Sequence, residues 1–197
     1  RGPFLSRIIN DSTAKVLVID AQYLDRLEAV ATELNALERC VVYPSCPEQI
    51  PPAIAERFEL SDFSVLYAEG DSTFDAGPAY HEMIGIMYTS GTTGTSKGVM
   101  ASHAHAYRYG RNVGNNHGVI ESDHYYTAGL PLFHIAGQWG VVYASMMTGA
   151  TVILRRGYRN DYFWPDIAKH GGTVVFMLGA IANFIWQQPP QKDDAET

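Results

Sequence analysis

Hydrophobic and polar positions along the chain follow two spacings, one typical of buried strands and one typical of helices. Short apolar runs predict strands, whereas apolar residues three or four positions apart with charges between them predict helices. The expected strands cover 15–19, 39–43, 84–88, 125–128, 151–154 and 173–177. The expected helices cover 24–34, 63–68, 104–113, 135–147, 162–170 and 180–188. This alternation indicates βαβ units, so we predict an α/β fold with a doubly wound, largely parallel sheet and flanking helices.

Prolines and glycines mark the expected breaks between these elements. Residues 44–53 contain four prolines and are predicted as a loop, as are residues 70–78. Gly171 and Gly172 follow one expected helix, and Pro189 and Pro190 follow the last one. The chain contains no internal repeat and no low-complexity segment.

Residues 125–154 contain no Asp, Glu, Lys or Arg, and this stretch is long enough to raise the question of a membrane span. Pro131, His134, Gln138 and the glycines at 137, 140 and 149 interrupt it. We therefore predict a buried helix followed by a buried strand. No signal peptide is visible at the start, and we predict a cytoplasmic protein.

Composition narrows the class of protein. The 197 residues are 46% hydrophobic and 18% charged, which favours a folded core over disorder. A formal charge of −7 without basic clusters argues against nucleic-acid binding. Cys40 and Cys46 could pair across a short loop, but two cysteines in a chain of this size are better interpreted as cytosolic thiols.

Residues 88–98, Tyr-Thr-Ser-Gly-Thr-Thr-Gly-Thr-Ser-Lys-Gly, carry the most specific chemistry. They follow an apolar run that reads as a buried strand. A hydroxyl-rich, glycine-containing loop at the end of a strand can turn N–H groups and hydroxyls towards an oxyanion, and Lys97 adds a positive charge. The segment suits the binding of a triphosphate.

Two other interpretations of this segment are weaker. A solvent-exposed linker would have no reason to follow a buried strand or to return at once to the apolar Val99 and Met100. A Walker A loop fails on spacing, because a pattern started at Gly91 requires glycine where Ser96 stands. Lys97 is also followed by Gly98, which has no hydroxyl for magnesium.

The 88–98 segment resembles the phosphate-binding signature of the adenylate-forming, or AMP-binding, superfamily, which includes acyl-CoA synthetases. A second segment, Leu-Pro-Leu-Phe-His-Ile-Ala-Gly at 130–137, is similar to the family's aromatic motif beside the acyl pocket. The element order around both motifs also fits the family. The resemblance implies that residues 1–197 are a partial N-terminal AMP-binding domain, without the family's small C-terminal domain.

The resemblance also implies roles for individual residues. The expected ATP phosphate-binding residues are Thr89, Ser90, Gly91, Thr92, Thr93, Gly94, Thr95, Ser96 and Lys97. Thr92 is expected to help ligate magnesium. The expected acyl-pocket residues are Phe133, His134, Gly137 and Gln138.

The acyl-pocket motif also bears on the substrate. Peptide-synthetase adenylation domains typically carry Phe-Asp where this chain has Phe133 and His134, and their Asp binds the ammonium of an amino acid. Histidine lacks that fixed charge, so an amino-acid substrate is disfavoured. His134 could instead be a structural histidine, and this alternative stays open.

The implied activity is that of an ATP-dependent acyl-CoA ligase with ATP, Mg²⁺ and CoA as cofactors or cosubstrates. The Phe-His motif and residues 176–190 are also similar to crotonobetaine/carnitine-CoA ligases, which suggests fatty acid or carnitine metabolism. We expect a small-molecule carboxylate as the substrate, together with ATP and CoA. We expect neither binding of nucleic acid nor a membrane span. Formation of a homo-oligomer stays open. The alternative is a non-catalytic nucleotide-binding or regulatory fragment that kept the phosphate loop.

The family's motifs for adenine and ribose, and its catalytic lysine, are not found in residues 1–197. No Tyr-Gly-x-Thr-Glu segment is present. The isolated chain is therefore expected to be inactive. His103 and His105 are one residue apart and would point in different directions on a helix, which makes them a poor metal pair.

Overall fold

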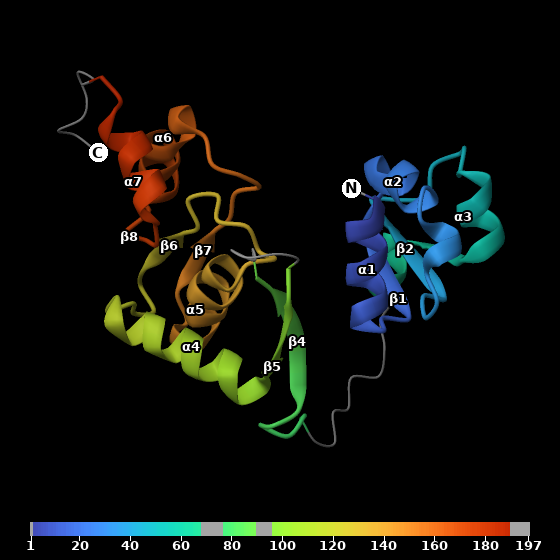
Figure 1. Ribbon diagram of the computed structural model, residues 1–197. Helices are drawn as coiled ribbons and strands as arrows, with labels where there is room; N and C mark the ends of the chain where they lie inside the picture. Colours follow the sequence, from blue (N-terminus) through green and yellow to red (C-terminus); the bar gives the residue numbers. More distant parts are fainter. Residues whose placement is uncertain (1, 68–76, 90–95, 190–197) are drawn as a thin grey trace. The chain divides into compact units, whose positions relative to one another are not determined.

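The computed structural model describes residues 2–67, 77–89 and 96–189. Its chain divides into two compact units, residues 1–76 and residues 77–197 (Figure 1). The elements confirm an α/β fold with parallel sheets and flanking helices.

The first unit is a three-stranded parallel sheet covered by helices on one face. The sheet order is β1–β2–β3, formed by β1 (Val16–Asp20), β2 (Arg39–Tyr43) and β3 (Glu59–Asp62). The helices are α1 (Gly2–Ser12), α2 (Leu24–Glu28) and α3 (Pro52–Arg57). Short 3₁₀ turns cover Ala21–Tyr23, Ala31–Glu33 and Phe63–Tyr67. Alternate strand residues face the helices, and the core includes Leu27, Cys40, Val42 and Ile54.

Besides α1, α3 and β3, which the hydrophobic spacing did not predict, three parts of this unit differ from the sequence expectation. The expected helix over 24–34 ends at Glu28, although Leu24, Leu27, Ala31 and Leu34 are all buried as the spacing requires. The expected helix over 63–68 is a 3₁₀ turn. The expected loop over 44–53 ends early, because Pro52 takes the first position of α3, where a missing N–H costs nothing.

The second unit begins with an antiparallel hairpin of β4 (Met83–Tyr88) and β5 (Gly98–Ser102). Helix α4 (His103–Asn116) follows directly. It starts where the Ser102 side chain accepts a hydrogen bond from the His105 N–H. The hairpin was not expected from the sequence, because β5 is largely exposed and lacks a buried face of its own.

A parallel sheet with the order β7–β6–β8 completes the second unit. Its strands are β6 (His124–Tyr126), β7 (Thr151–Ile153) and β8 (Val174–Val175). The connections are a π-helical segment η4 (Ala136–Tyr143), then α5 (Ala144–Thr148) and α6 (Asn160–His170), and α7 (Gly179–Trp186) follows β8. Within the described ranges, no helix is long and apolar enough to cross a membrane.

Candidate functional site

The phosphate loop predicted from the sequence is closed at its base by the β4–β5 hairpin. Tyr88 pairs with Gly98 in the last register position of the two strands. One residue further on, the Thr89 N–H donates to the Lys97 carbonyl at 3.0 Å, and the Lys97 N–H contacts Thr89 Oγ1 at 3.4 Å. The two ends of the loop are therefore held side by side.

Gly98 leaves little room for a side chain at this base. A Cβ on Gly98 would lie 2.7 Å from Ile86 Cγ2 and 3.4 Å from the Tyr88 ring. The absence of a side chain at Gly98 lets the chain leave the loop in close contact with β4, the strand that leads into it.

The described loop residues carry groups that suit an anion. The Lys97 side chain is exposed, and Ser96 beside it is half-buried. Six expected phosphate-binding residues lie outside the described residues, namely Ser90, Gly91, Thr92, Thr93, Gly94 and Thr95. The magnesium role expected of Thr92 therefore stays a prediction. Across the parts of the chain that are described, no cluster of three or more His, Cys, Asp or Glu side chains could hold a metal ion.

The aromatic motif leaves the carboxyl end of β6. Thr127 is buried there, and its N–H donates to the Ile153 carbonyl at 3.0 Å. Ala128 and Gly129 then adopt positive φ angles of 48° and 75°. A Cβ on Gly129 would lie 2.2 Å from the Tyr158 nitrogen, so only glycine allows this turn to pack against 157–158. The packed turn fixes the direction in which residues 130–134 leave the sheet.

His134 is exposed and caps the start of the following helical segment. Its Nδ1 accepts a hydrogen bond from the Ala136 N–H at 3.1 Å, and its carbonyl accepts one from the Gln138 N–H at 3.0 Å. Since a backbone N–H can only donate, the neutral ring carries its proton on Nε2. His134 can therefore offer an N–H donor while its other ring nitrogen is held by the backbone.

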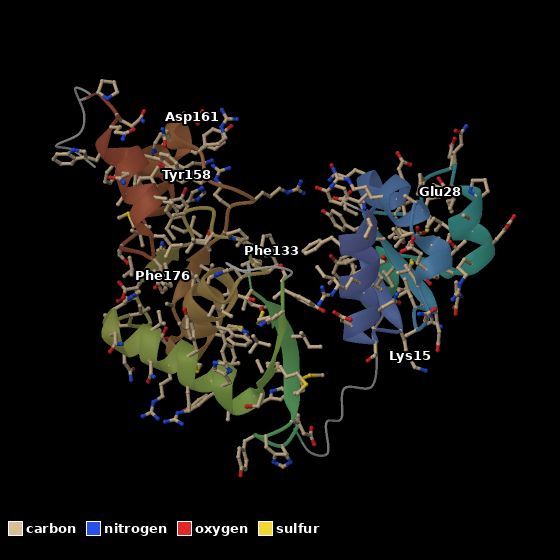
Figure 2. The ribbon with its side chains drawn as sticks, in the orientation of Figure 1. Lys15, Glu28, Phe133, Tyr158, Asp161 and Phe176 are labelled. Carbon is tan, nitrogen blue, oxygen red and sulfur yellow. The ribbon has the colours of Figure 1, made fainter. Side chains whose placement is uncertain are left out.

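The other expected acyl-pocket residues divide into exposed and buried positions. The Phe133 ring is 84% exposed (Figure 2), and Gln138 is also exposed. Gly137 is buried, and a Cβ there would lie 2.6 Å from the Pro131 carbonyl oxygen. Gly137 thus allows the first turn of η4 to pack against the segment that precedes it.

An ion pair between the buried Asp166 and the partly exposed Arg155 links α6 to the segment that follows β7. The Asp166 carboxylate is 3% exposed, accepts two hydrogen bonds from the Arg155 guanidinium, and accepts a third from Tyr126 Oη at 3.0 Å. Hydrogen bonding to Arg155 lowers the pKa of Asp166, and burial raises the pKa of Tyr126. The sequence alone gave no signal for this network, because its residues are 11 to 40 positions apart.

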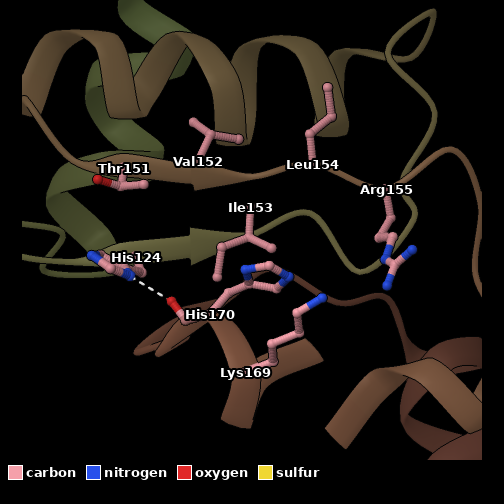
Figure 3. A pocket seen from close by; sticks show the side chains of 8 residues that line it. All are labelled: His124, Thr151, Val152, Ile153, Leu154, Arg155, Lys169 and His170. Atoms are coloured by element: carbon pink, nitrogen blue, oxygen red, sulfur yellow. Dashed lines mark hydrogen bonds between the residues drawn. The ribbon is translucent and has the colours of Figure 1, made fainter. Parts of the chain in front are cut away.

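A cavity of about 500 Å³ also lies along β7 and the end of α6 (Figure 3). It is lined by His124, residues 151–154, Arg155, Lys169 and His170, and none of these is an expected site residue. His124 Nδ1 bonds to the His170 carbonyl at 2.7 Å. Lys169 and His170 occupy the last turn of α6, where positive side chains complement the helix dipole. The basic lining thus has a structural explanation.

Comparison with known proteins identifies relatives over nearly the whole chain. Residues 3–197 match the family described as AMP-binding enzyme. Long-chain fatty acid transport protein 1 of Mus musculus is 33% identical over 188 residues, which cover 94% of this chain and 28% of the mouse protein. The sulfoacetate–CoA ligase of Cupriavidus necator is 35% identical over 104 residues, which cover 53% of this chain and 20% of the ligase.

A solved structure agrees with these relatives. The inhibitor-bound N-terminal domain of FACL13 from Mycobacterium tuberculosis superimposes with a TM-score of 0.73 at 25% identity, covering 95% of this chain and 44% of that one. The chain spans less than a third of the length of the mouse transport protein and of the sulfoacetate–CoA ligase. Since the family match covers both expected motifs, the chain belongs to the AMP-binding enzyme family.

Proposed function

We propose that this chain is the N-terminal part of an ATP-dependent acyl-CoA ligase. In the first step, a carboxylate oxygen attacks the α-phosphorus of ATP, an O–P bond forms, and pyrophosphate leaves. In the second step, the CoA thiol attacks the acyl carbon, and AMP leaves as the thioester forms. The observation that carries the proposal is the closed base of the loop, where Thr89 and Lys97 are bonded side by side.

The residues of this chain contribute binding and orientation to the first step. The proposed role of Lys97 and the loop hydroxyls is to hold the β- and γ-phosphates, so that negative charge on the departing pyrophosphate is stabilised. Magnesium would neutralise further phosphate charge. Thr92 is the ligand proposed for it from the family resemblance.

The acyl group is proposed to contact the exposed aromatic motif. The ring of Phe133 offers an apolar surface, and His134 offers the Nε2–H donor left free by its bond to Ala136. The names of the two sequence relatives above, a long-chain fatty acid transport protein and a sulfoacetate–CoA ligase, support a carboxylic acid, such as a fatty acid, as the substrate. A carnitine-type acid and a cytoplasmic location remain predictions from the sequence.

The alternative is a nucleotide-binding or regulatory fragment that performs no chemistry. It shares the phosphate loop with the ligase, so ATP binding alone does not separate the two. Acid-dependent exchange of pyrophosphate into ATP does, because it requires reversible formation of an acyl-adenylate.

The test is ATP–pyrophosphate exchange by the full-length protein that contains residues 1–197, with Thr92→Ala and Lys97→Ala. One charge-assisted contact contributes about 1.5–3 kcal/mol, so we expect exchange to fall about ten- to a hundred-fold. Thioester formation from supplied acyl-adenylate and CoA should fall much less, because pyrophosphate has already left. Lys169→Ala, also an exposed lysine of the second unit, is the matched control and should keep the wild-type rate.

If Thr92→Ala and Lys97→Ala keep wild-type exchange rates, the loop does not hold the triphosphate. If the wild-type protein shows no exchange with any acid of a broad panel, the non-catalytic alternative is favoured.

A further inference from the structure

One small hydrophobic cluster of the second unit contacts both segments of the candidate site. Its buried members are Ala101, Ala106 and Trp139, and the partly buried Met87, Tyr109, Ile135 and Tyr143 pack against them. Met87 lies two residues before Thr89, at the base of the phosphate loop. Ile135 follows His134 directly. The cluster therefore joins the strand pair that closes the loop to the segment that carries the aromatic motif.

Trp139 is the largest buried side chain of this cluster and is held from several sides. It is 4% exposed, and its ring makes edge contacts with His105 at 5.6 Å and Tyr109 at 6.3 Å between ring centroids. Helix α4 approaches its backbone closely, since a Cβ on Gly110 would lie 3.1 Å from the Trp139 carbonyl oxygen. A wide, rigid ring packed in this way fixes the spacing of the elements around it.

We propose that Trp139 is a positioning residue that sets the placement of the phosphate-loop base, at Thr89 and Lys97, relative to the acyl-binding segment. This inference rests on the proposed function, in which the α-phosphate held by one segment must meet a carboxylate held by the other. Reacting atoms must come within about 3–3.5 Å, and a misplacement of about 1 Å can cost a hundred-fold in rate. In this proposal Trp139 acts through its cluster, against which Met87 and Ile135 pack.

A purely space-filling role for Trp139 predicts a different result. Truncation of the ring would then lower stability and leave the rate of each folded molecule unchanged. Phe58 provides the matched comparison, because it is an aromatic residue, 5% exposed, and belongs to the hydrophobic cluster of the first unit, which includes no residue of either site segment. Phe58→Leu should cost stability without changing the spacing between the two site segments.

The experiment compares Trp139→Leu, Trp139→Phe and Phe58→Leu in the full-length protein. Steady-state ATP–pyrophosphate exchange gives kcat and the KM values for ATP and the acid. Hydrogen exchange follows the Thr89 amide, which donates to the Lys97 carbonyl at the loop base. Thermal unfolding sets an assay temperature at which every variant is folded.

We expect Trp139→Leu to lower kcat by about ten- to a hundred-fold with each KM changed by less than about threefold. Its Thr89 amide should exchange faster than in the wild type. Trp139→Phe, which keeps an aromatic ring against His105 and Tyr109, should recover most of both losses. Phe58→Leu should melt at a lower temperature yet keep the wild-type kcat and Thr89 protection.

The inference is overturned if Trp139→Leu keeps the wild-type kcat, or if it and Phe58→Leu lose kcat equally while folded. Unchanged protection of the Thr89 amide in Trp139→Leu also overturns it. A wild-type protein that shows no exchange with any acid refutes the proposed function and, with it, the catalytic part of this inference. The hydrogen-exchange comparison then still decides whether Trp139 fixes the loop base.

Discussion

At the scale of single residues, His134 shows how structure sharpens a question that the sequence left open. The sequence allowed a buried structural histidine or a substrate-facing one. The ring is exposed, and the bond from the Ala136 N–H to Nδ1 gives it a local structural role as well. These two roles use different parts of the side chain, so substitutions can separate them.

We expect His134→Ala to reorder the preference of the full-length protein among carboxylic acids. Loss of the acceptor for the Ala136 N–H should also cost about 1 kcal/mol of stability. His134→Asn should restore the acceptor and the melting temperature but not the wild-type preference. The measurement is a panel of acids assayed with both variants beside thermal unfolding. An unchanged rank order of acids in both variants would leave His134 with the capping role alone.

Asp166 gives a second residue-scale prediction, which concerns pH. Its carboxylate is bonded to Arg155 and Tyr126, and hydrogen bonding to Arg155 holds its pKa below the ordinary value. A group with a depressed pKa stabilises the fold above its unfolded pKa of about 3.9 and loses that contribution as the pH falls through the folded value. Asp166→Asn should therefore lower the melting temperature by several degrees at pH 7, and the difference from wild type should shrink in acid.

Asp161→Asn is the matched control for this prediction, because Asp161 lies on the same helix and is also bonded to an arginine, Arg159, but is exposed. Exposed ion pairs contribute little, so its melting temperature at pH 7 should stay near the wild-type value. Equal effects of the two substitutions would show that burial of Asp166 does not matter. The measurement is thermal unfolding between pH 3 and pH 7.

At the scale of elements, hydrophobic spacing predicted buried positions better than it predicted regular structure. The strand over 39–43 and the helical region over 135–147 are confirmed, and each buries a block of mostly apolar residues, Cys40, Val41 and Val42 in the first and Ala136, Trp139, Val141 and Ala144 in the second. The apolar residues at helical spacing within 24–34 are buried as expected, yet helix α2 ends at Glu28, and a 3₁₀ turn follows at Ala31–Glu33. Helix α1 and strand β5, which bury only two residues and one residue, were not predicted from the sequence.

Gly137 allows an element-scale prediction in which two effects oppose one another. Alanine in a helical segment is favoured over glycine by about 1 kcal/mol. A Cβ at this position would, however, meet the Pro131 carbonyl oxygen at 2.6 Å and the Leu130 carbonyl oxygen at 2.9 Å, and backbone atoms cannot move aside cheaply. Gly137→Ala should therefore destabilise by about 1–3 kcal/mol, as overpacking does.

Gly179→Ala is the control for Gly137→Ala, since Gly179 begins α7 and nothing lies within 4 Å of a Cβ there. It should be neutral or slightly stabilising. Chemical unfolding of both variants measures the difference. A neutral Gly137→Ala would mean that η4 does not pack closely against residues 130–131.

At the scale of the whole molecule, the two site segments are predictable as motifs but their connection is not. The hydroxyl-rich loop and the aromatic motif stand out in the sequence because each is contiguous. Their shared support is a cluster drawn from β4, β5, α4 and η4, and no local pattern indicates that Met87, Ala101 and Trp139 meet. Packing between distant segments is set by the tertiary fold, which single-sequence spacing does not contain.

The last prediction concerns what residues 1–197 can do alone. Family members use further motifs for adenine, ribose and a catalytic lysine, and this sequence carries none of them. Catalysis depends on reacting groups that are positioned together, so loss of several at once should abolish turnover rather than reduce it in proportion. We therefore expect purified 1–197 to form no acyl-CoA from ATP, CoA and any acid that the full-length protein accepts. A circular dichroism spectrum and a cooperative melting transition would establish that the tested chain is folded. Measurable acyl-CoA formation by that folded chain would mean that residues 1–197 already hold a complete catalytic site, and the division of labour proposed between this chain and the remainder of the protein would be wrong.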